Sequence, residues 1–140
     1  MMLMSNPPLV LPIVLVNEDT HELTYLHDRL LEAGVENPLV TFPDEESVLD
    51  YLGAVCLAAV PRLIPCLIFL DLRLPRIPEM IHWVRAQELL GKLKIVVLSD
   101  QPADSPALPA GADHRISRFP TAMTLATIVA CACGRGLSPG

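Results

Sequence analysis

The chain has 140 residues, 51% of them hydrophobic, and a formal net charge of −6 at pH 7. This length allows one domain with a buried core, and the apolar content argues against disorder except at the two ends. Because Lys92 and Lys94 are its only lysines, the chain has no basic stripe for nucleic acid. Its apolar runs stop before the roughly 20 residues of a membrane span, and its start lacks the basic segment of a signal peptide. We therefore expect a cytoplasmic protein that binds neither nucleic acid nor membrane.

The predicted elements alternate along the chain after an expected flexible arm at residues 1–9. A strand at 11–16 is followed by a helix at 21–33 that Gly34 ends, a strand at 39–42, and a helix at 44–56 with Asp44 as N-cap. A strand at 66–70, a helix around 80–84 that Gly91 ends, and a strand at 95–98 come next. A weaker strand at 115–119 and a helix at 121–133 complete the pattern, before an expected flexible tail at 134–140.

This alternation predicts one α/β domain over residues 10–133, built on a doubly wound sheet of five parallel strands with helices on both faces. Each strand is a short aliphatic run, as expected for strands buried on both faces. Between the fourth and fifth strands, Pro102, Pro106 and Pro109 exclude a long helix. The helix expected in this connection, the fourth in chain order, is therefore predicted to be shortened or missing.

The four cysteines, Cys56, Cys66, Cys131 and Cys133, do not follow the pattern of a small disulfide-rich secreted domain. Three of them fall inside apolar segments, where a buried thiol usually acts as a small hydrophobic side chain. Cys131 and Cys133 are two residues apart on a predicted helix and point in different directions, which argues against a metal or redox pair. We expect free thiols in a reducing cytoplasm.

Polar residues follow the predicted strands, at the edge of the sheet where ligands bind in such folds. They are Asn17, Glu18 and Asp19 after the first strand, Asp71 after the third, Ser99 after the fourth and Arg118 near the end of the fifth. Carboxylates that converge repel one another unless a cation joins them, and Mg²⁺ suits such oxygen ligands. A metal beside an aspartate can draw in a phosphoryl donor, and a hydroxyl and a cation can then hold the phosphate oxygens.

The segments VLVNED, LEAG, LIFLDLRLP, VVLSD and GAD, spread over residues 11 to about 130, resemble the receiver domain family of response regulators. DLRLP after an aliphatic strand is the most specific of these segments. The stretch before LIFLD, together with LSDQPAD, is similar to stand-alone receivers found beside phytochrome-type histidine kinases. The resemblance implies a flavodoxin-like receiver fold and a single-domain response regulator, not an enzyme, that takes a phosphoryl group from a histidine kinase in two-component signalling and signals through protein contacts.

The resemblance also implies roles for individual residues. Asp71 matches the phosphorylated aspartate, Ser99 the switch hydroxyl, and Arg118 the position of a lysine. Glu18 matches the acidic Mg²⁺ ligand, assisted weakly by Asn17, and the backbone carbonyl of Arg73 would complete the metal site together with Asp71.

Several residues depart from the family pattern. Asn17 removes a carboxylate from the metal pocket, and at Arg118 a guanidinium replaces an ammonium, which is not an equivalent phosphate ligand. Arg115 replaces an aromatic switch residue, and the eroded fourth helix alters a surface that meets targets in the family. These departures favour an alternative, a degenerate pseudo-receiver that acts as a phosphorylation-independent interaction module.

A third hypothesis is a small enzyme or cofactor binder on the same architecture, such as a flavodoxin-like electron carrier. It is disfavoured because NEDTHEL is acidic and contains no phosphate-binding loop. The hydrophobic excess is compatible with a homodimer.

Overall fold

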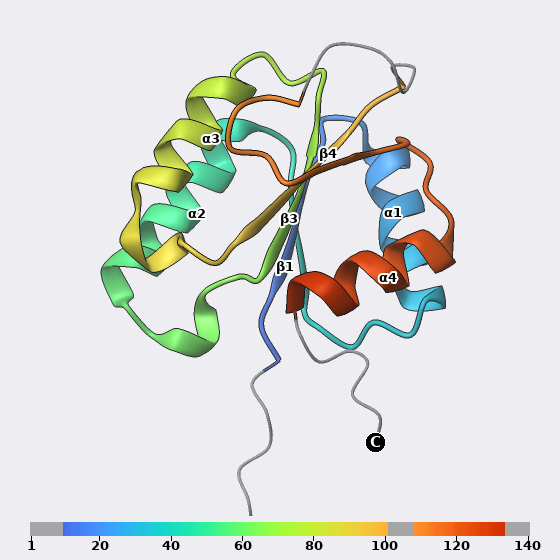
Figure 1. Ribbon diagram of the computed structural model, residues 1–140, viewed down its shortest axis with the longest axis horizontal. Helices are drawn as coiled ribbons and strands as arrows, with labels where there is room; N and C mark the ends of the chain where they lie inside the picture. The colour runs from blue at the N-terminus through green and yellow to red at the C-terminus, as the bar shows by residue number, and fades with distance from the viewer. Residues whose placement is uncertain (1–9, 101–107, 134–140) are drawn as a thin grey trace, which may run out of the picture.

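The computed structural model describes residues 10–100 and 108–133, in which strands and helices alternate (Figure 1). The strands are β1 (Ile13–Val16), β2 (Leu39–Phe42), β3 (Leu67–Asp71), β4 (Lys94–Leu98) and β5 (His114–Ile116). The α-helices are α1 (Thr20–Glu32), α2 (Glu45–Ala58), α3 (Ile77–Ala86) and α4 (Ala122–Cys133), and the short 3-10 helices are η1 (Pro61–Leu63) and η2 (Glu88–Leu90). The arm and tail expected at residues 1–9 and 134–140 lie outside the described residues.

The described strands form one parallel sheet in the order β2-β1-β3-β4-β5. Helices α2 and α3 cover one face of this sheet, and α1 and α4 cover the other (Figure 1). The predicted doubly wound, five-stranded architecture is therefore confirmed. The described parts of the connection from β4 to β5, residues 99–100 and 108–113, contain a turn and no helix, while Pro102 and Pro106 lie outside the described residues.

The sheet has a hydrophobic core on each face, because successive side chains of a strand point to opposite sides. The five residues of β3 are all buried, which puts this strand at the centre of both cores. On the α2–α3 face the core includes Val14, Ile68, Leu70, Val48, Leu52 and Val84. On the α1–α4 face it includes Ile13, Leu15, Phe69, Leu26, Leu30 and Leu125. No helix of the described residues is long and apolar enough to cross a membrane.

The first turn of α1 starts directly after the polar end of β1. The Asp19 side chain is the N-cap and accepts hydrogen bonds from the backbone N–H groups of His21 (2.9 Å) and Glu22 (3.2 Å). Asp44 caps α2 as predicted, through the N–H of Ser47 at 2.8 Å. Gly34, with a φ of +85°, follows the end of α1 in a backbone conformation that favours glycine. The cap at Asp19 places Glu22 in the first turn of the helix, within hydrogen-bonding reach of Asn17 at the end of β1.

Glu45, in the first turn of α2, ties this helix to the start of α3. Its carboxylate is buried and accepts hydrogen bonds from the backbone N–H of Arg76 at 2.8 and 3.1 Å. Burial raises the pKa of Glu45 above its usual value. The folded state therefore favours the neutral form, and the associated stability is present at acid pH and is lost as the pH rises through the raised pKa.

Glu45→Gln is expected to increase the free energy of unfolding at pH 7, because the amide oxygen still accepts from Arg76 without a buried charge. The gain should shrink as the pH falls through the raised pKa of Glu45 and should vanish below the usual glutamate pKa of about 4.3. Urea unfolding at several pH values measures this difference. Glu46→Gln, at an exposed position in the same helical turn, is the control and should show no such gain. A stability of Glu45→Gln below that of the native chain at pH 7 would contradict the prediction.

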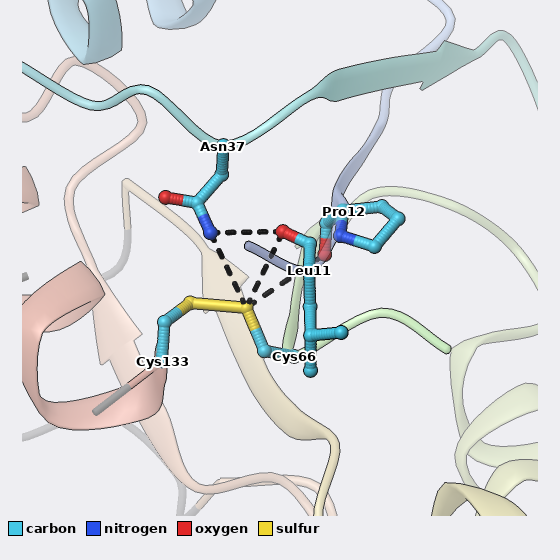
Figure 2. Close-up of a disulfide and its surroundings, with 5 residues drawn as sticks. All are labelled: Leu11, Pro12, Asn37, Cys66 and Cys133. Atoms are coloured by element: carbon cyan, nitrogen blue, oxygen red, sulfur yellow. Dashed lines mark hydrogen bonds between the residues drawn. A yellow bond between two sulfur atoms is a disulfide. The ribbon is translucent and has the colours of Figure 1, made fainter. Parts of the chain in front are cut away.

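A disulfide joins Cys66, just before β3, to Cys133, at the end of α4 (Figure 2). The Cα atoms are 5.4 Å apart, within the usual range for a disulfide. Around it, the Asn37 amide donates to the Leu11 carbonyl at 2.8 Å. The expectation of free thiols is therefore wrong for this pair, whereas Cys56 and Cys131 are free. The cross-link lies at the amino ends of the strands, at the edge of the sheet opposite Asp71.

Candidate functional site

A polar hollow of about 310 Å³ lies at the carboxyl ends of β1 and β3, lined by Asn17, Glu18, Asp19, Asp71 and Arg73. Asn17 and Asp71 are only 4% and 1% exposed. Ser99 is also buried, directly after Leu98, which is the sheet partner of Asp71. The parallel register thus brings together residues far apart in the sequence, as expected for this edge of the sheet.

Asp71 is held by the side chain of Arg73, two residues further along the chain. The guanidinium Nε lies 3.0 Å from both Asp71 oxygens, and Nη2 lies 2.6 Å from Oδ2. The backbone N–H of Arg73 also donates to Oδ1 at 3.1 Å. The hydrogen bond with Asp71 raises the pKa of Arg73, so the guanidinium stays charged. The structure brings the side chain of Arg73 to the site, and the metal role of its backbone carbonyl stays a prediction.

Glu22, on the first turn of α1, connects this ion pair to a second arginine. Its Oε1 accepts from Arg73 Nη2 at 2.6 Å and from Asn17 Nδ2 at 3.0 Å. Its Oε2 lies 3.4 Å from Arg118 Nη2. The Glu22 side chain is only 10% exposed, so these donors compensate for its loss of hydration.

The amide at Asn17 suits this arrangement because each of its ends has a defined partner. Asn17 Oδ1 accepts from the backbone N–H of Asp19 at 2.8 Å, which leaves Nδ2 to donate to Glu22. An aspartate at this position would place a second carboxylate against Glu22. The departure from the family pattern at Asn17 therefore allows a hydrogen bond to Glu22 in place of a repulsion between two carboxylates.

Arg118 lies at the rim beyond β5 and binds two carboxylates. Besides Glu22, it contacts Asp100 Oδ2 through Nη1 at 3.1 Å. The next residue, Phe119, packs edge-on against Tyr25 of α1 with ring centres 5.3 Å apart, which holds this loop against the helix. Arg118 thus contacts Glu22 and Asp100, and its role toward a phosphate stays a prediction.

The hollow does not fit Mg²⁺ in this arrangement. Both oxygens of Asp71 and Oε1 of Glu22 are bound by a guanidinium. Glu18, the predicted metal ligand, lines the hollow but is exposed. Within residues 10–100 and 108–133, no three His, Cys, Asp or Glu side chains form a group that could hold a metal ion. The metal roles of Glu18 and Asn17 stay predictions.

The sequence reading missed Glu22 and the side chain of Arg73. The sequence does contain a signal for Glu22, which comes three residues after the capping Asp19. A glutamate at this spacing usually indicates only a favourable charge at a helix N-terminus. Arg73 is two residues past Asp71 in a loop, where sequence alone does not define the direction of a long side chain.

No family model and no curated protein matches the sequence. The fold is nevertheless similar to solved receiver domains. The receiver domain of a sensor histidine kinase from Pseudomonas aeruginosa, with a magnesium ion coordinated in its active site cleft, is 19% identical, with a TM-score of 0.67 over 89% of this chain and 98% of that chain. The phosphorylated cyanobacterial phytochrome response regulator RcpA is 23% identical, with a TM-score of 0.65 over 92% and 95% of the two chains. A receiver domain from Rhodospirillum rubrum is 21% identical, with a TM-score of 0.68 over 84% and 90%.

These likenesses, together with the strand order and the polar hollow, define the class of structure. The chain has the fold of response regulator receiver domains, and the similar structures include phytochrome-associated response regulators. The resemblance recognised in the DLRLP segment is confirmed at the level of the fold.

Proposed function

We propose that this chain is a cytoplasmic receiver module of a two-component signalling system, in which a histidine kinase transfers a phosphoryl group to Asp71. The observation that carries the proposal is the buried Asp71 at the wall of the polar hollow, paired with Arg73 and linked through Glu22 to Arg118. The receiver fold supports the same assignment. In this role the chain is a phosphoryl acceptor and a signalling partner rather than an enzyme.

The proposed transfer requires one oxygen of Asp71 to leave its contact with Arg73. This oxygen forms a bond to phosphorus while the P–N bond of a phosphohistidine on the kinase breaks. The departing ring nitrogen takes up a proton, and Asp71 becomes an acyl phosphate. The guanidinium groups of Arg73 and Arg118 are suited to neutralise the transferred charge through bidentate contacts.

Asp71→Asn is expected to abolish phosphorylation completely, because an amide oxygen is a much weaker nucleophile than a carboxylate. The full chain is incubated with acetyl phosphate in parallel buffers with Mg²⁺ and with EDTA, and the added phosphoryl mass is measured. Asp28→Asn, at an exposed aspartate on α1, is the control and should retain the native incorporation. A native chain that takes up no phosphoryl group in either buffer, or an Asp71→Asn variant that still does, would contradict the proposal.

The second candidate is an interaction module that works without phosphorylation. The specific observation in its favour is the multiple contact of Arg73 with Asp71, which occupies the oxygens that would have to react. In this case the rim is a fixed, partly neutralised surface for a protein partner. The acetyl phosphate experiment separates the two, since this candidate predicts no incorporation.

A further inference from the structure

One nitrogen of Arg73 bridges two carboxylates that come from different elements. Nη2 lies 2.6 Å from Asp71 Oδ2, at the end of β3, and 2.6 Å from Glu22 Oε1, in the first turn of α1. Asp71 and Glu22 are 2% and 10% exposed at their side chains. Two carboxylates this close to one point, and this far from water, need a positive charge between them.

The residues next to Glu22 present hydrogen-bond donors to its carboxylate, an arrangement that suits a guanidinium better than a metal ion. Asn17 turns its amide N–H group toward Glu22, and this group donates a hydrogen bond but cannot ligate a cation. Arg118 binds the other oxygen of Glu22. Both oxygens of Glu22 are therefore engaged by donors, and both oxygens of Asp71 are engaged by Arg73.

We propose that Arg73 is a built-in counter-cation of this site: its guanidinium occupies the place between Asp71 and Glu22 in which a divalent cation would bridge them, and it keeps divalent cations out. The Arg73 side chain is 51% exposed and belongs to a loop. It can therefore move away from the carboxylates without unfolding the sheet. The inference deepens the proposed function, since Arg73 would be the charge that meets a phosphoryl group at Asp71.

The test measures divalent-cation binding without any phosphoryl donor, so that its outcome is independent of the phosphorylation assay. The full chain is stripped with EDTA and titrated with Mn²⁺, and free Mn²⁺ is followed by electron paramagnetic resonance. Mg²⁺ is then added in competition. The variants are Arg73→Gln, which removes the charge, and Arg73→Lys, which keeps it. Arg62→Gln, at an exposed position on η1 near the opposite edge of the sheet, is the control with the same change in net charge.

We expect the native chain, Arg73→Lys and Arg62→Gln to bind Mn²⁺ weakly and alike. Arg73→Gln should bind about tenfold tighter or more, because no guanidinium charge then competes with the ion for the carboxylates of Asp71 and Glu22. Its melting temperature should also rise with Mg²⁺ more than that of the native chain, since an ion that binds only the folded state stabilises it.

Equal Mn²⁺ affinities of the native chain and Arg73→Gln would overturn the proposal. An equal gain in Arg62→Gln would do the same, because net charge rather than position would then be the cause. If Arg73→Gln does not fold, the Mn²⁺ affinities of Arg73→Ala and of the native chain are compared in 1 M NaCl. The native chain alone also provides a test, since tight Mn²⁺ binding by it would show that Arg73 does not exclude the ion.

Discussion

Replacing Cys133 by serine is expected to lower the free energy of unfolding by about 2–4 kcal/mol, the usual range for loss of a native disulfide. The bond joins residues 67 positions apart in the sequence. Opening it therefore releases a long loop in the unfolded chain, and it also frees the last turn of α4 from the start of β3. Urea denaturation at pH 7, in the presence and absence of dithiothreitol, measures the effect.

The disulfide prediction has an internal control at Cys131, an exposed free thiol on the same helix. Cys131→Ser should unfold at the native midpoint. The native chain in dithiothreitol should have the same free energy of unfolding as Cys133→Ser. The free energy of unfolding of Cys133→Ser itself should not change when the reductant is added. Four free thiols in the native chain by mass spectrometry after alkylation, or a midpoint unaffected by reduction, would contradict the prediction.

The fold could be predicted from local patterns because each element carries a strong signal. Every aliphatic run in β1, β3 and β4 is short and bounded by polar residues, which indicates a strand buried on both faces. Asp44 and Gly34 mark helix ends through capping and left-handed backbone, as the structure confirms. The fifth strand was harder to place. The prediction covered residues 115–119, whereas β5 spans only His114–Ile116, because Arg118 and Phe119 turn toward α1.

The candidate site could be predicted only in part, because strand ends define positions and not side-chain partners. The convergence of Asn17, Asp71 and Ser99 followed from the parallel sheet. The bridge from Asp71 through Arg73 to Glu22 depends on the packing of α1 against the sheet, which no local pattern describes. The disulfide was missed for a related reason: the spacing of cysteines in a sequence does not determine which pair meets in space.

Glu22→Gln is expected to lower the free energy of unfolding by about 2 kcal/mol, because hydrogen bonds to a charged group contribute about 1.5–3 kcal/mol and this carboxylate has three donors. The amide retains one acceptor oxygen, so part of the network survives. In the variant, Arg73 retains its ion pair with Asp71. Arg118 retains only its contact with Asp100, whose side chain is 59% exposed. Urea unfolding at low and high NaCl concentrations measures the loss and its dependence on salt.

Glu32→Gln is the matched control, since it makes the same chemical change in the last turn of the same helix. Glu32 pairs with Arg29 at 2.9 Å, but its side chain is 57% exposed. An exposed pair of this kind contributes about 0.3–0.5 kcal/mol and is screened by salt. The cost of Glu22→Gln should therefore be several times larger and should persist in high salt. Equal costs for the two variants would mean that Glu22 is an ordinary surface charge, and the bridge between β3 and α1 would then lose its physical basis.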